Sequence, residues 1–370
     1  MKKILAQCKK ELMQFRRDRL TLSLAFLLPL LSLLLFGFAV RLEIKHVSLA
    51  IQNFDTGLMS YSLVDSLLNN GQFDASEWRG RFPLEDALDK GKARAAVIIP
   101  PEFSRELKQG HSTHVQVIID ATDVNNARVI KNSIIGTING FHMSNHLIPS
   151  HLPVECETRL WFNPGRREAL YIVPGALAVV LWIYPSLLAA LAMVREIESG
   201  TILQAYASSI TATEFLSGKV LAYLIISSTM AGFLIFCAIV IFDICMVGDP
   251  TPYIVGLLCF LLSSVCFGSL IGTAMHSQNA AVQTVGTAGF IPALLFSGYI
   301  YPIRNVVYPL SYLTMVVPTR WFVQLSRDSF LRGCNWSYDW YLPLILATSA
   351  AVFFGVAYSN ISTMQIKSKE

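Results

Sequence analysis

Long apolar stretches recur along this chain, and charged or polar residues separate them. A helix needs about 20 consecutive apolar residues to cross the hydrocarbon core of a bilayer. Six stretches of that kind contain no Asp, Glu, Lys or Arg. They are Leu20–Val40, Ala169–Val194, Val220–Phe242, two within Pro250–Ile303, and Trp340–Ile366. The pattern therefore predicts an α-helical membrane protein with six transmembrane helices.

A shorter apolar segment lies between the fifth and sixth stretches. Asn305–Thr319 is too short to cross a membrane, and it contains Pro309 and Pro318. Proline lacks a backbone N–H and interrupts helices. We therefore expect residues 302–339 to form a re-entrant or interfacial element instead of a further crossing.

Residues 41–168 follow a different pattern, in which short β-type segments alternate with helical ones. Strands are predicted at HVSLAIQ, ARAAVIIP and HVQVIID. Helices are predicted at Leu58–Asn70, Leu84–Lys90 and Glu102–Gln109. A further long helix is indicated by apolar residues at helical spacing after Asp123, namely Ala127, Ile130, Ile134, Ile138 and Phe141. This alternation is typical of a small α/β domain, which we expect between the first and second transmembrane helices.

Composition and charge place these elements relative to a membrane. The chain is 53% hydrophobic and only 15% charged, which lies outside the averages of soluble proteins. Lys and Arg concentrate on the cytoplasmic side of membrane helices. Because residues 1–19 are strongly basic, we expect a cytoplasmic N-terminus, and the spans within 169–366 return the tail, 367–370, to the same side. Residues 41–168 are then an extracytoplasmic domain.

The N-terminal segment before the first span has a helical pattern of its own. Ile4, Cys8, Leu12 and Phe15 recur at helical spacing with lysines between them. This pattern predicts an amphipathic helix on the inner leaflet over residues 1–19. A solvated basic tail is the alternative. A cleaved signal peptide is disfavoured, because the apolar run that follows is too long and no clear cleavage site follows it.

The chain lacks the residues that would let it power transport alone. Ion-coupled carriers usually keep ionisable residues within their spans, and the six predicted spans contain no acidic or basic residue. The phosphate-binding pattern G-x-x-x-x-G-K-[ST] of ATPases does not occur. An intramembrane enzyme would need paired carboxylates, a metal cluster or an activated nucleophile within the spans, which show none of these. If this protein moves a substrate, we expect another subunit to supply the energy.

A polar segment, residues 195–219, connects the second and third predicted spans, and the orientation places it in the cytoplasm. It begins with charged residues, and Gly200 is expected to end the preceding helix. We expect a short helix over Thr201–Ser208, lying across the membrane surface. A second helical turn is expected to begin near Glu214, and Lys219 to anchor the next span.

The pattern RE-x-E-x-GT, an apolar stretch and then T-x-x-E-x-x-x-GK resembles the cytoplasmic coupling segment of ABC type-2 exporter permeases. The resemblance extends over nearly the whole chain. It includes the basic amphipathic start, the large domain after the first span, and Ser297-Gly298 with Pro302 and Pro318 after the fifth span. The segments IPPEF and DATDVNNA are similar to those of a branch that includes multidrug-type export permeases.

This resemblance implies a half-transporter in the bacterial inner membrane that is not itself an enzyme. The subunit would pair with a second copy or a sister permease, and a cytoplasmic ATPase subunit would bind ATP and Mg and drive it. It would export lipophilic or drug-like compounds, or lipids, and a periplasmic adaptor protein is a further expected partner. The residues implied to couple the chain to the ATPase are Arg195, Glu196, Glu198, Gly200, Thr201 and Glu214. No nucleic acid partner and no cofactor of the chain itself are implied.

Similar permeases carry substrate along faces of the second and fifth spans. The corresponding residues here are Trp182, Tyr184, Gln283, Thr284 and Ser297. Aromatic and small residues at these positions suit a cavity for lipophilic cargo. They suit packing between membrane helices equally well, so the sequence leaves both roles open.

Two further residue sets and one further function need weighing. Cys156 and Cys334 would both face the oxidising side, where a disulfide is permitted. His142 and His146 are one helical turn apart but lack an acidic partner at suitable spacing, so we expect no metal site. The alternative function is a membrane-anchored sensor or adhesin that binds a ligand through the outside domain. Co-purification with an ATPase would separate the two.

Overall fold

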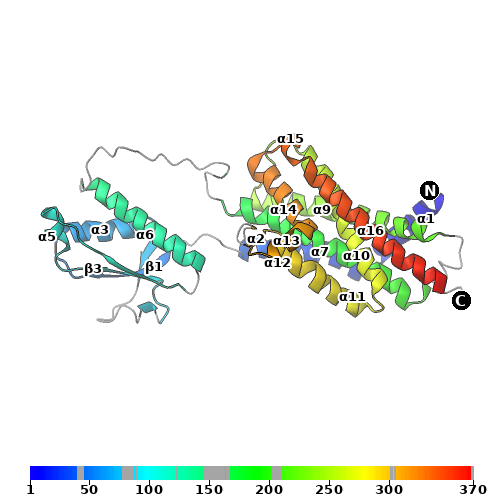
Figure 1. The fold of residues 1–370 in the computed structure, drawn as a ribbon, viewed down its shortest axis with the longest axis horizontal. Helices are drawn as coiled ribbons and strands as arrows, with labels where there is room; N and C mark the ends of the chain where they lie inside the picture. Colours follow the sequence, from blue (N-terminus) through cyan, green and yellow to red (C-terminus); the bar gives the residue numbers. More distant parts are fainter. Residues whose placement is uncertain are drawn as a thin grey trace. The chain divides into compact units, whose positions relative to one another are not determined.

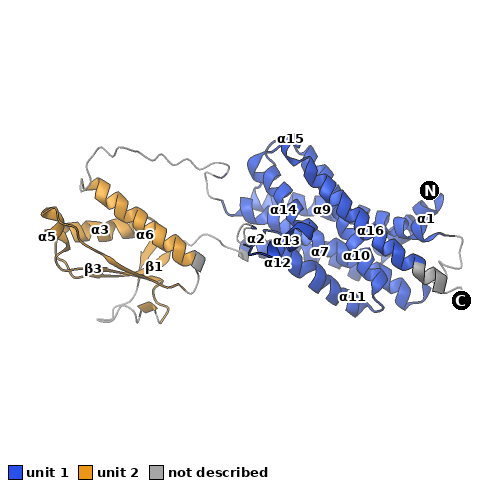
Figure 2. Cartoon of the chain, viewed as in Figure 1, with its two compact units in different colours: residues 1–40, 160–370 blue, residues 41–159 orange. Residues whose placement is uncertain are grey.

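The computed structural model describes residues 1–39, 46–76, 87–88, 90–121, 124–145, 163, 167–201, 210–300, 303 and 306–367. The chain divides into two compact units (Figure 2). Residues 1–40 together with 160–370 make up the first, which we call the helical unit. Residues 41–159 make up the second, which we call the sheet unit. Each unit is described by itself.

The described part of the sheet unit is built on four strands in the order β2-β1-β3-β4. The strands are β1 Val47–Asn53, β2 Phe73–Ala75, β3 Ala95–Ile99 and β4 Gln116–Ile119. β1 pairs in parallel with β2 and β3, whereas β3 and β4 are antiparallel. Side chains alternate between the two faces of the sheet, so that Val97 and Ile99 enter one core cluster and Ala96 the other.

Three helices of the sheet unit contribute to the apolar core on one face of the sheet. They are α3 Leu58–Leu68, α5 Phe103–Lys108 and α6 Val124–Ser144. The core joins strand residues to Leu63 and Leu67 of α3, Phe103 of α5, and Ile134 and Phe141 of α6. Figure 1 shows α3 and α6 on the same side of the strands. The apolar spacing after Asp123 thus marks the buried side of α6, as predicted.

One strand of the sheet unit was not expected from the sequence. β2 is only three residues long, which is too short for an alternating pattern to be visible, and its pairing of Phe73 with Val47 of β1 defines it. The helix predicted over Leu84–Lys90 lies mostly outside the described residues. Of that segment, Ala87 and Leu88 are described as helical.

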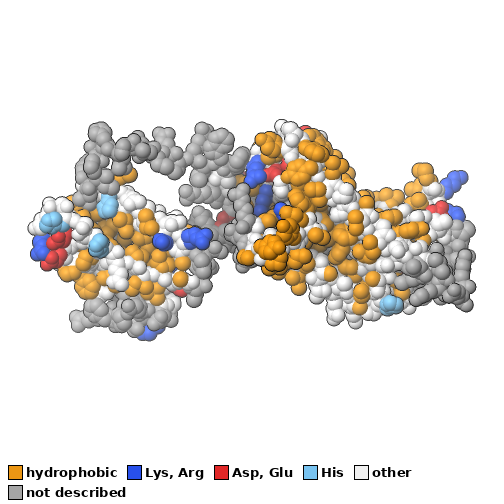
Figure 3. Space-filling model, viewed as in Figure 1, with side chains coloured by type: hydrophobic (Ala, Val, Ile, Leu, Met, Phe, Trp, Pro, Cys, Tyr) orange, Lys and Arg blue, Asp and Glu red, His pale blue; other side chains and the backbone are white. Residues whose placement is uncertain are grey.

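Six helical segments of the described helical unit are long and apolar enough to cross a membrane, which confirms the predicted number of spans. Five are single α-helices: α2 Arg19–Ala39, α7 Ala169–Glu198, α9 Ala212–Phe242, α10 Thr251–Ala274 and α16 Tyr341–Lys367. The fifth span in chain order combines α11 Gln278–Thr284, the π-helix η1 Val285–Phe290 and α12 Ile291–Phe296. The helix α1, Lys2–Arg17, precedes them all. Figure 3 shows hydrophobic side chains spread over the visible face of this unit.

Helix α7 packs closely along α10, because glycines of α10 face it. A Cβ atom on Gly268 would lie 2.0 Å from the carbonyl oxygen of Ser186. On Gly272 it would lie 2.6 Å from the Cβ of Met193. Small residues let membrane helices approach to backbone contact. This contact fixes the position of α7, the most enclosed of the six candidate spans.

Two spans differ from the prediction at their charged ends. α7 continues through Arg195 to Glu198, and α9 begins already at Ala212. The prediction ended each span at the first charged residue and placed no charged residue inside a span. The structure corrects this, because Lys219 lies within α9 and is buried. The physical reason is that these charges pair with one another, so that the helices can continue past them.

Four short helical segments follow the fifth span in the described part of the chain. They are α13 Leu310–Val316, α14 Pro318–Arg327, the π-helix η3 Asp328–Arg332 and α15 Trp336–Asp339. None of these four is long enough to cross a membrane. The re-entrant placement of residues 302–339 stays a prediction.

Candidate coupling site at the ends of α7 and α9

The end of α7 carries most of the predicted coupling residues. Arg195 and Glu196 lie in its last turn, and Glu198 is its final residue. Ser199 caps the helix, and Gly200 follows with φ of +66°, a backbone conformation that favours glycine. The Thr201 hydroxyl lies 3.0 Å from the hydroxyl of Ser199. Gly200 therefore ends the helix as the sequence predicts.

The chain re-enters a helix at a capping box. The Thr211 side chain accepts a hydrogen bond from the backbone N–H of Glu214, and the Glu214 side chain accepts one from the N–H of Thr211. This reciprocal arrangement satisfies two helix N–H groups that otherwise lack partners. Glu214 also lies 3.9 Å from the ammonium of Lys3 on α1. Residues 202–209, which hold most of the short helix predicted after Gly200, lie outside the described residues.

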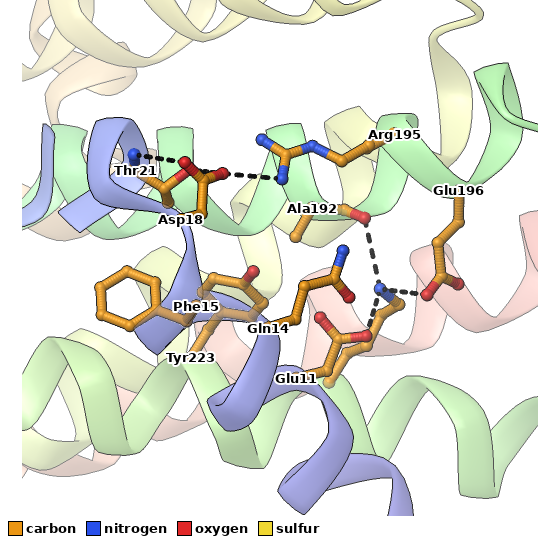
Figure 4. Close-up of a pocket in the computed structure, with 10 residues that line it drawn as sticks. Glu11, Gln14, Phe15, Asp18, Thr21, Ala192, Arg195, Glu196 and Tyr223 are labelled. Carbon is orange, nitrogen blue, oxygen red and sulfur yellow. Dashed lines mark hydrogen bonds and ion pairs between the residues drawn. The ribbon is translucent and has the colours of Figure 1, made fainter.

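Lys219, two turns into α9, is the centre of a buried charge cluster. Figure 4 labels three residues that it contacts, Glu11, Ala192 and Glu196. Its side chain is 3% exposed, and its ammonium lies 2.8 Å from Glu11 of α1 and 3.2 Å from Glu196 of α7. It also donates a hydrogen bond to the carbonyl oxygen of Ala192. A single ammonium group thus joins α1, α7 and α9.

The cluster is nearly neutral because a second ammonium enters it. Lys10 donates to Glu196 at 2.9 Å, and its own side chain is 53% exposed. Gln7 donates to Glu11 across one turn of α1. Two carboxylates therefore meet two ammonium groups. Burying unpaired charges would cost several kcal/mol per ion, so the pairing is what permits Glu11 and Glu196 to lie inside.

A second ion pair lies beside this cluster at the junction of α1 and α2. Arg195 donates to Asp18 at 3.0 Å, and Thr21 donates to the same carboxylate through its hydroxyl and its N–H. The side-chain hydrogen bond from Thr21 lowers the pKa of Asp18, and Arg195 lowers it further. Asp18 thus caps the start of α2 and links it to the end of α7.

The two charge groups border a small cavity (Figure 4). Its volume is about 20 Å³, which has room for about one water molecule. Phe15 and Tyr223 form the apolar part of its wall, and Gln14 lies beside them. A polar cavity of this size leaves little freedom for the side chains around it.

Helix α1 can approach α9 closely because Gly218 has no side chain. A Cβ atom there would lie 2.7 Å from the Cβ of Gln7. The residues of the motif T-x-x-E-x-x-x-GK thus have separate structural roles. Thr211 and Glu214 begin the helix, Gly218 admits α1, and Lys219 forms the buried ion pairs.

Glu198 connects α7 to the fifth span. Its carboxylate accepts hydrogen bonds from the backbone N–H and the side-chain amide of Gln278, at 2.8 and 2.5 Å. Gln278 is the first residue of α11. A movement of the end of α7 would therefore be transmitted to α1 and α9 through Lys219. It would also be transmitted to α11 through Glu198.

The residues predicted to line a substrate path occupy different environments. Trp182 is buried and stacks on Phe260 and Phe267, which is a packing role. Ser297 is buried in the turn after α12, where its hydroxyl accepts a hydrogen bond from a backbone N–H. Gln283 is exposed on α11, and Thr284 is half-buried there.

Tyr184 is the one predicted path residue that lines a large cavity. The cavity has a volume of about 310 Å³ and lies among α2, α7 and the fifth span. The Tyr184 hydroxyl is hydrogen-bonded to Ser32 at 2.6 Å. The rest of the lining is apolar apart from backbone: Phe36, Val179, Val180, Ile183, Leu187, Val282, Val285, Gly286 and Phe290. One polar pair in an apolar cavity suits a lipophilic ligand.

The proposed disulfide rests on only one described residue. Cys334 is half-buried and follows the π-helix η3. Cys156 lies outside the described residues, so the pairing stays a prediction.

The sequence interpretation missed the cluster around Lys219. It predicted an amphipathic helix on the inner leaflet with its apolar face at Ile4, Cys8, Leu12 and Phe15, whereas the fully buried residues of α1 are Gln7, Cys8 and Glu11. The buried face includes Glu11 because Lys219 neutralises its carboxylate. Lys219 itself could have indicated the cluster. The capping pattern at Thr211 predicts a helix that begins there, and Lys219 then lies two turns inside this helix.

Comparison with known proteins identifies the family to which this chain belongs. The model of the ABC-2 family transporter proteins matches residues 19–363, which is most of the chain. The chain belongs to the ABC-2 transporter family. It is therefore a multi-pass membrane protein of an ABC transporter, and its family implies a partner ATPase subunit.

Several permeases of this family are similar along the whole chain. "Probable multidrug ABC transporter permease YbhS" of Escherichia coli is 27% identical over 100% of this chain and 97% of its own length. "Probable multidrug ABC transporter permease YbhR" of the same organism is 27% identical over 94% of this chain and 96% of its own. "Inner membrane transport permease YhhJ" is 24% identical over 89% and 91%, respectively. These full-length matches support the role of a permease subunit.

Proposed function

We propose that this ABC-2 family chain is the permease subunit of an exporter that moves lipophilic or drug-like compounds, or lipids, out of the cell. A separate ATPase would dock on residues 195–219 and transmit its closure to the helices. The subunit would act as a pair, with a second copy of itself or with a sister permease. The multidrug names of two similar permeases support this substrate class.

The buried cluster around Lys219 is the observation that carries the proposal. A docking partner can drive a membrane helix only if the contacted segment is rigidly connected to it. Here Lys219 joins α1, α7 and α9, and Glu198 joins α7 to α11. A push on the connection between α7 and α9 would therefore move four helices together.

The cavity beside Tyr184 supports the proposed cargo. It is mostly apolar, it lies between the second and fifth spans, and its volume is at the lower end of that of small-molecule sites. We propose Tyr184 and Ser32 as the polar contacts of the cargo. Trp182 would instead hold α7 against α10 through its aromatic stacking.

The orientation in this proposal follows from the basic N-terminus. With both termini in the cytoplasm, the ends of α7 and α9 at Lys219 face the cytoplasm, where an ATPase would lie. The sheet unit is then extracytoplasmic, where it would be available to an adaptor protein. The location would be the inner membrane, the location in the name of the similar permease YhhJ.

Replacement of Glu198 by lysine tests the coupling role. A lysine cannot accept the two hydrogen bonds from Gln278, so α7 would lose its hydrogen-bonded connection to α11. The variant complex, with its ATPase, is reconstituted in liposomes, and ATP hydrolysis is measured with and without the lipophilic dye rhodamine 6G. We expect the variant to insert normally. Its dye-stimulated rate of ATP hydrolysis should fall at least about fivefold.

Glu102→Lys is the matched control, because Glu102 is an exposed glutamate of the sheet unit. It should keep the stimulation of the unchanged protein. Full stimulation in Glu198→Lys would refute the coupling role. Absence of any stable complex between the unchanged chain and an ATPase would refute the proposed function as a whole.

A further inference from the structure

A basic groove lies between α1 and the end of α7, next to the cluster around Lys219. Its volume is about 480 Å³. Four of its lining residues belong to α1 and form one stripe along the helix, because they are spaced i, i+3, i+4 and i+7. They are Lys10, Met13, Gln14 and Arg17. Asp18 and Arg195 complete the lining. We call this the α1 groove.

The charges of the α1 groove are unbalanced. Three of its six lining residues are cations and one is an anion. Lys10 and Arg195 each have an ion-pair partner, in Glu196 and Asp18 respectively. Arg17 is exposed and has no ion pair to any residue that the structure describes. Among the described residues, the groove therefore has one guanidinium without an ion pair next to two cations that are already paired.

The position of the groove along the chain fixes its depth relative to a membrane. α1 ends at Arg17 and the first span begins at Arg19, so Asp18 alone separates them. With α2 as the first span, the groove would lie where this span enters the bilayer, at the depth of the lipid head groups. Exposed apolar side chains continue from it on both helices, at Met13 of α1 and Leu20 of α2. Figure 3 shows Lys and Arg beside hydrophobic side chains at the end of the helical unit that carries the N-terminus.

We propose that the α1 groove binds the head group of an anionic phospholipid. The guanidinium of Arg17 would contact the phosphate, because a guanidinium can donate two parallel hydrogen bonds to phosphate oxygens. Lys10 and Arg195 would add positive charge from the opposite sides of the groove. The acyl chains would lie along the exposed apolar side chains of α2. Basic pockets beside membrane helices bind anionic head groups in this way.

The proposed lipid site would also act on the cluster around Lys219. Lys10 also belongs to that cluster through Glu196, and Arg195 belongs to the ion pair with Asp18 beside it, so the two cations attach α1 and the start of α2 to α7. A phosphate between Lys10 of α1 and Arg195 of α7 would contact both cations and so bridge the two helices directly. This inference goes beyond the proposed function, because it depends on membrane insertion and not on the cargo or the ATPase.

Native mass spectrometry of the purified full chain tests this binding directly. The protein is titrated with phosphatidylglycerol or with phosphatidylcholine of the same acyl chains, and bound lipid is counted. We expect the unchanged protein to prefer phosphatidylglycerol. Arg17→Gln should reduce that preference by about fivefold, the effect of one basic residue at an anionic membrane surface. The exposed position of Arg17 means that the variant should fold normally.

Arg16→Gln is the matched control. Arg16 is the neighbouring exposed arginine of α1, and it does not line the groove. Its replacement removes the same positive charge as Arg17→Gln. Full preference in Arg16→Gln beside a reduced preference in Arg17→Gln supports the site. An equal loss in both variants indicates diffuse attraction and overturns it. The proposal is also overturned by equal binding of the two lipids to the unchanged protein. It falls as well if Arg17→Gln keeps its lipid preference and instead loses the ATPase, because the groove would then bind the partner protein.

Discussion

Buried charges occur near both ends of α9, and the two sets are paired differently. Near its start, Lys219 lies between Glu11 and Glu196, and Lys10 neutralises the second carboxylate. Beyond its other end, the backbone of Val247 is bonded to the π-helix η3, which carries the buried Asp328. Asp339 is buried close to Asp328, and Arg332 is the one ion-pair partner of Asp328 among the described residues.

The difference shows what each set contributes. In the first set every carboxylate has an ammonium partner, so the contacts hold three helices together. In the second, Arg332 pairs with Asp328 at 2.7 Å, and one oxygen of Asp339 has no hydrogen-bond partner among the described residues. Burial and the charge of Asp328 raise the pKa of Asp339 to about 6, while Arg332 opposes this shift. The first set is a structural connection, and we expect the second to respond to pH.

Removing the central cation of the first set should have the largest effect. Lys219→Met keeps most of the apolar length of the side chain but removes the central ammonium from the buried Glu11 and Glu196. Loss of one partner of a buried pair typically costs about 3–5 kcal/mol. We expect a loss of that size in the free energy of unfolding, measured by urea titration in detergent.

Lys10→Met is the matched comparison, because Lys10 contacts Glu196 from an exposed position. Its loss should cost less than the loss of Lys219, because Lys219 still pairs with Glu196 and water reaches the half-exposed position of Lys10. Equal losses in the two variants would contradict the central role of Lys219.

The second set gives a pH prediction. The pKa of Asp339 is raised from 3.8 to about 6, so the folded chain holds this proton more tightly than the unfolded chain. The resulting stabilisation is present below about pH 4 and is lost as the pH rises through 6. Asp339→Asn should therefore raise the melting temperature at pH 7.5, by on the order of 2 °C. At pH 4 the variant and the unchanged protein should melt alike.

Other titratable groups around Asp339 could give the melting temperature a similar dependence on pH. Asp328, Arg332 and the thiol of Cys334 all lie near it, and burial raises the pKa of Asp328 as well. Asp243→Asn serves as the control, because Asp243 is 84% exposed, and it should leave the pH profile unchanged. A pH profile of Asp339→Asn that matches the unchanged protein would assign the dependence to Asp328.

The smallest effect is expected at Asp18, beside the first set. Its pKa is lowered by the hydrogen bond from Thr21 and by Arg195, so it stabilises the fold above about pH 4. That contribution is lost as the pH falls further. Asp18→Asn should cost less than about 1 kcal/mol at pH 7, because its pair with Arg195 is partly exposed. The difference from the unchanged protein should shrink below pH 4 in the same urea titrations, and a constant difference would contradict it.

Features set by local chemistry could be predicted from the sequence. The six spans follow from the length of the apolar stretches, and Gly200 ends α7 because its backbone has positive φ. The helical turn expected near Glu214 is the capping box with Thr211. The apolar face of α6 followed from its helical spacing. Each of these depends on residues within a few positions of one another.

Features set by contacts between distant segments could not be predicted. Glu11 and Lys219 are 208 positions apart, and spacing does not reveal which helices touch. When that contact is not known, the sequence alone leads to the expectation that a charged residue lies at the end of a span and not inside it. The same limit applies to Trp182 and Tyr184, which are two positions apart on α7. One packs against α10 and the other lines a cavity, which depends on the neighbouring helices.

Site-specific photo-crosslinking tests the central claim that the ATPase binds at the end of α7. A benzophenone amino acid is placed at Thr201, an exposed residue just after Gly200, and at Leu313 of α13 as the comparison. The complex is irradiated in native membranes, and crosslinked subunits are identified by mass spectrometry. We expect the ATPase to be captured from position 201 and not from position 313. Capture from 313 alone, or labelling of position 201 by a reagent confined to the outer side, would contradict the account.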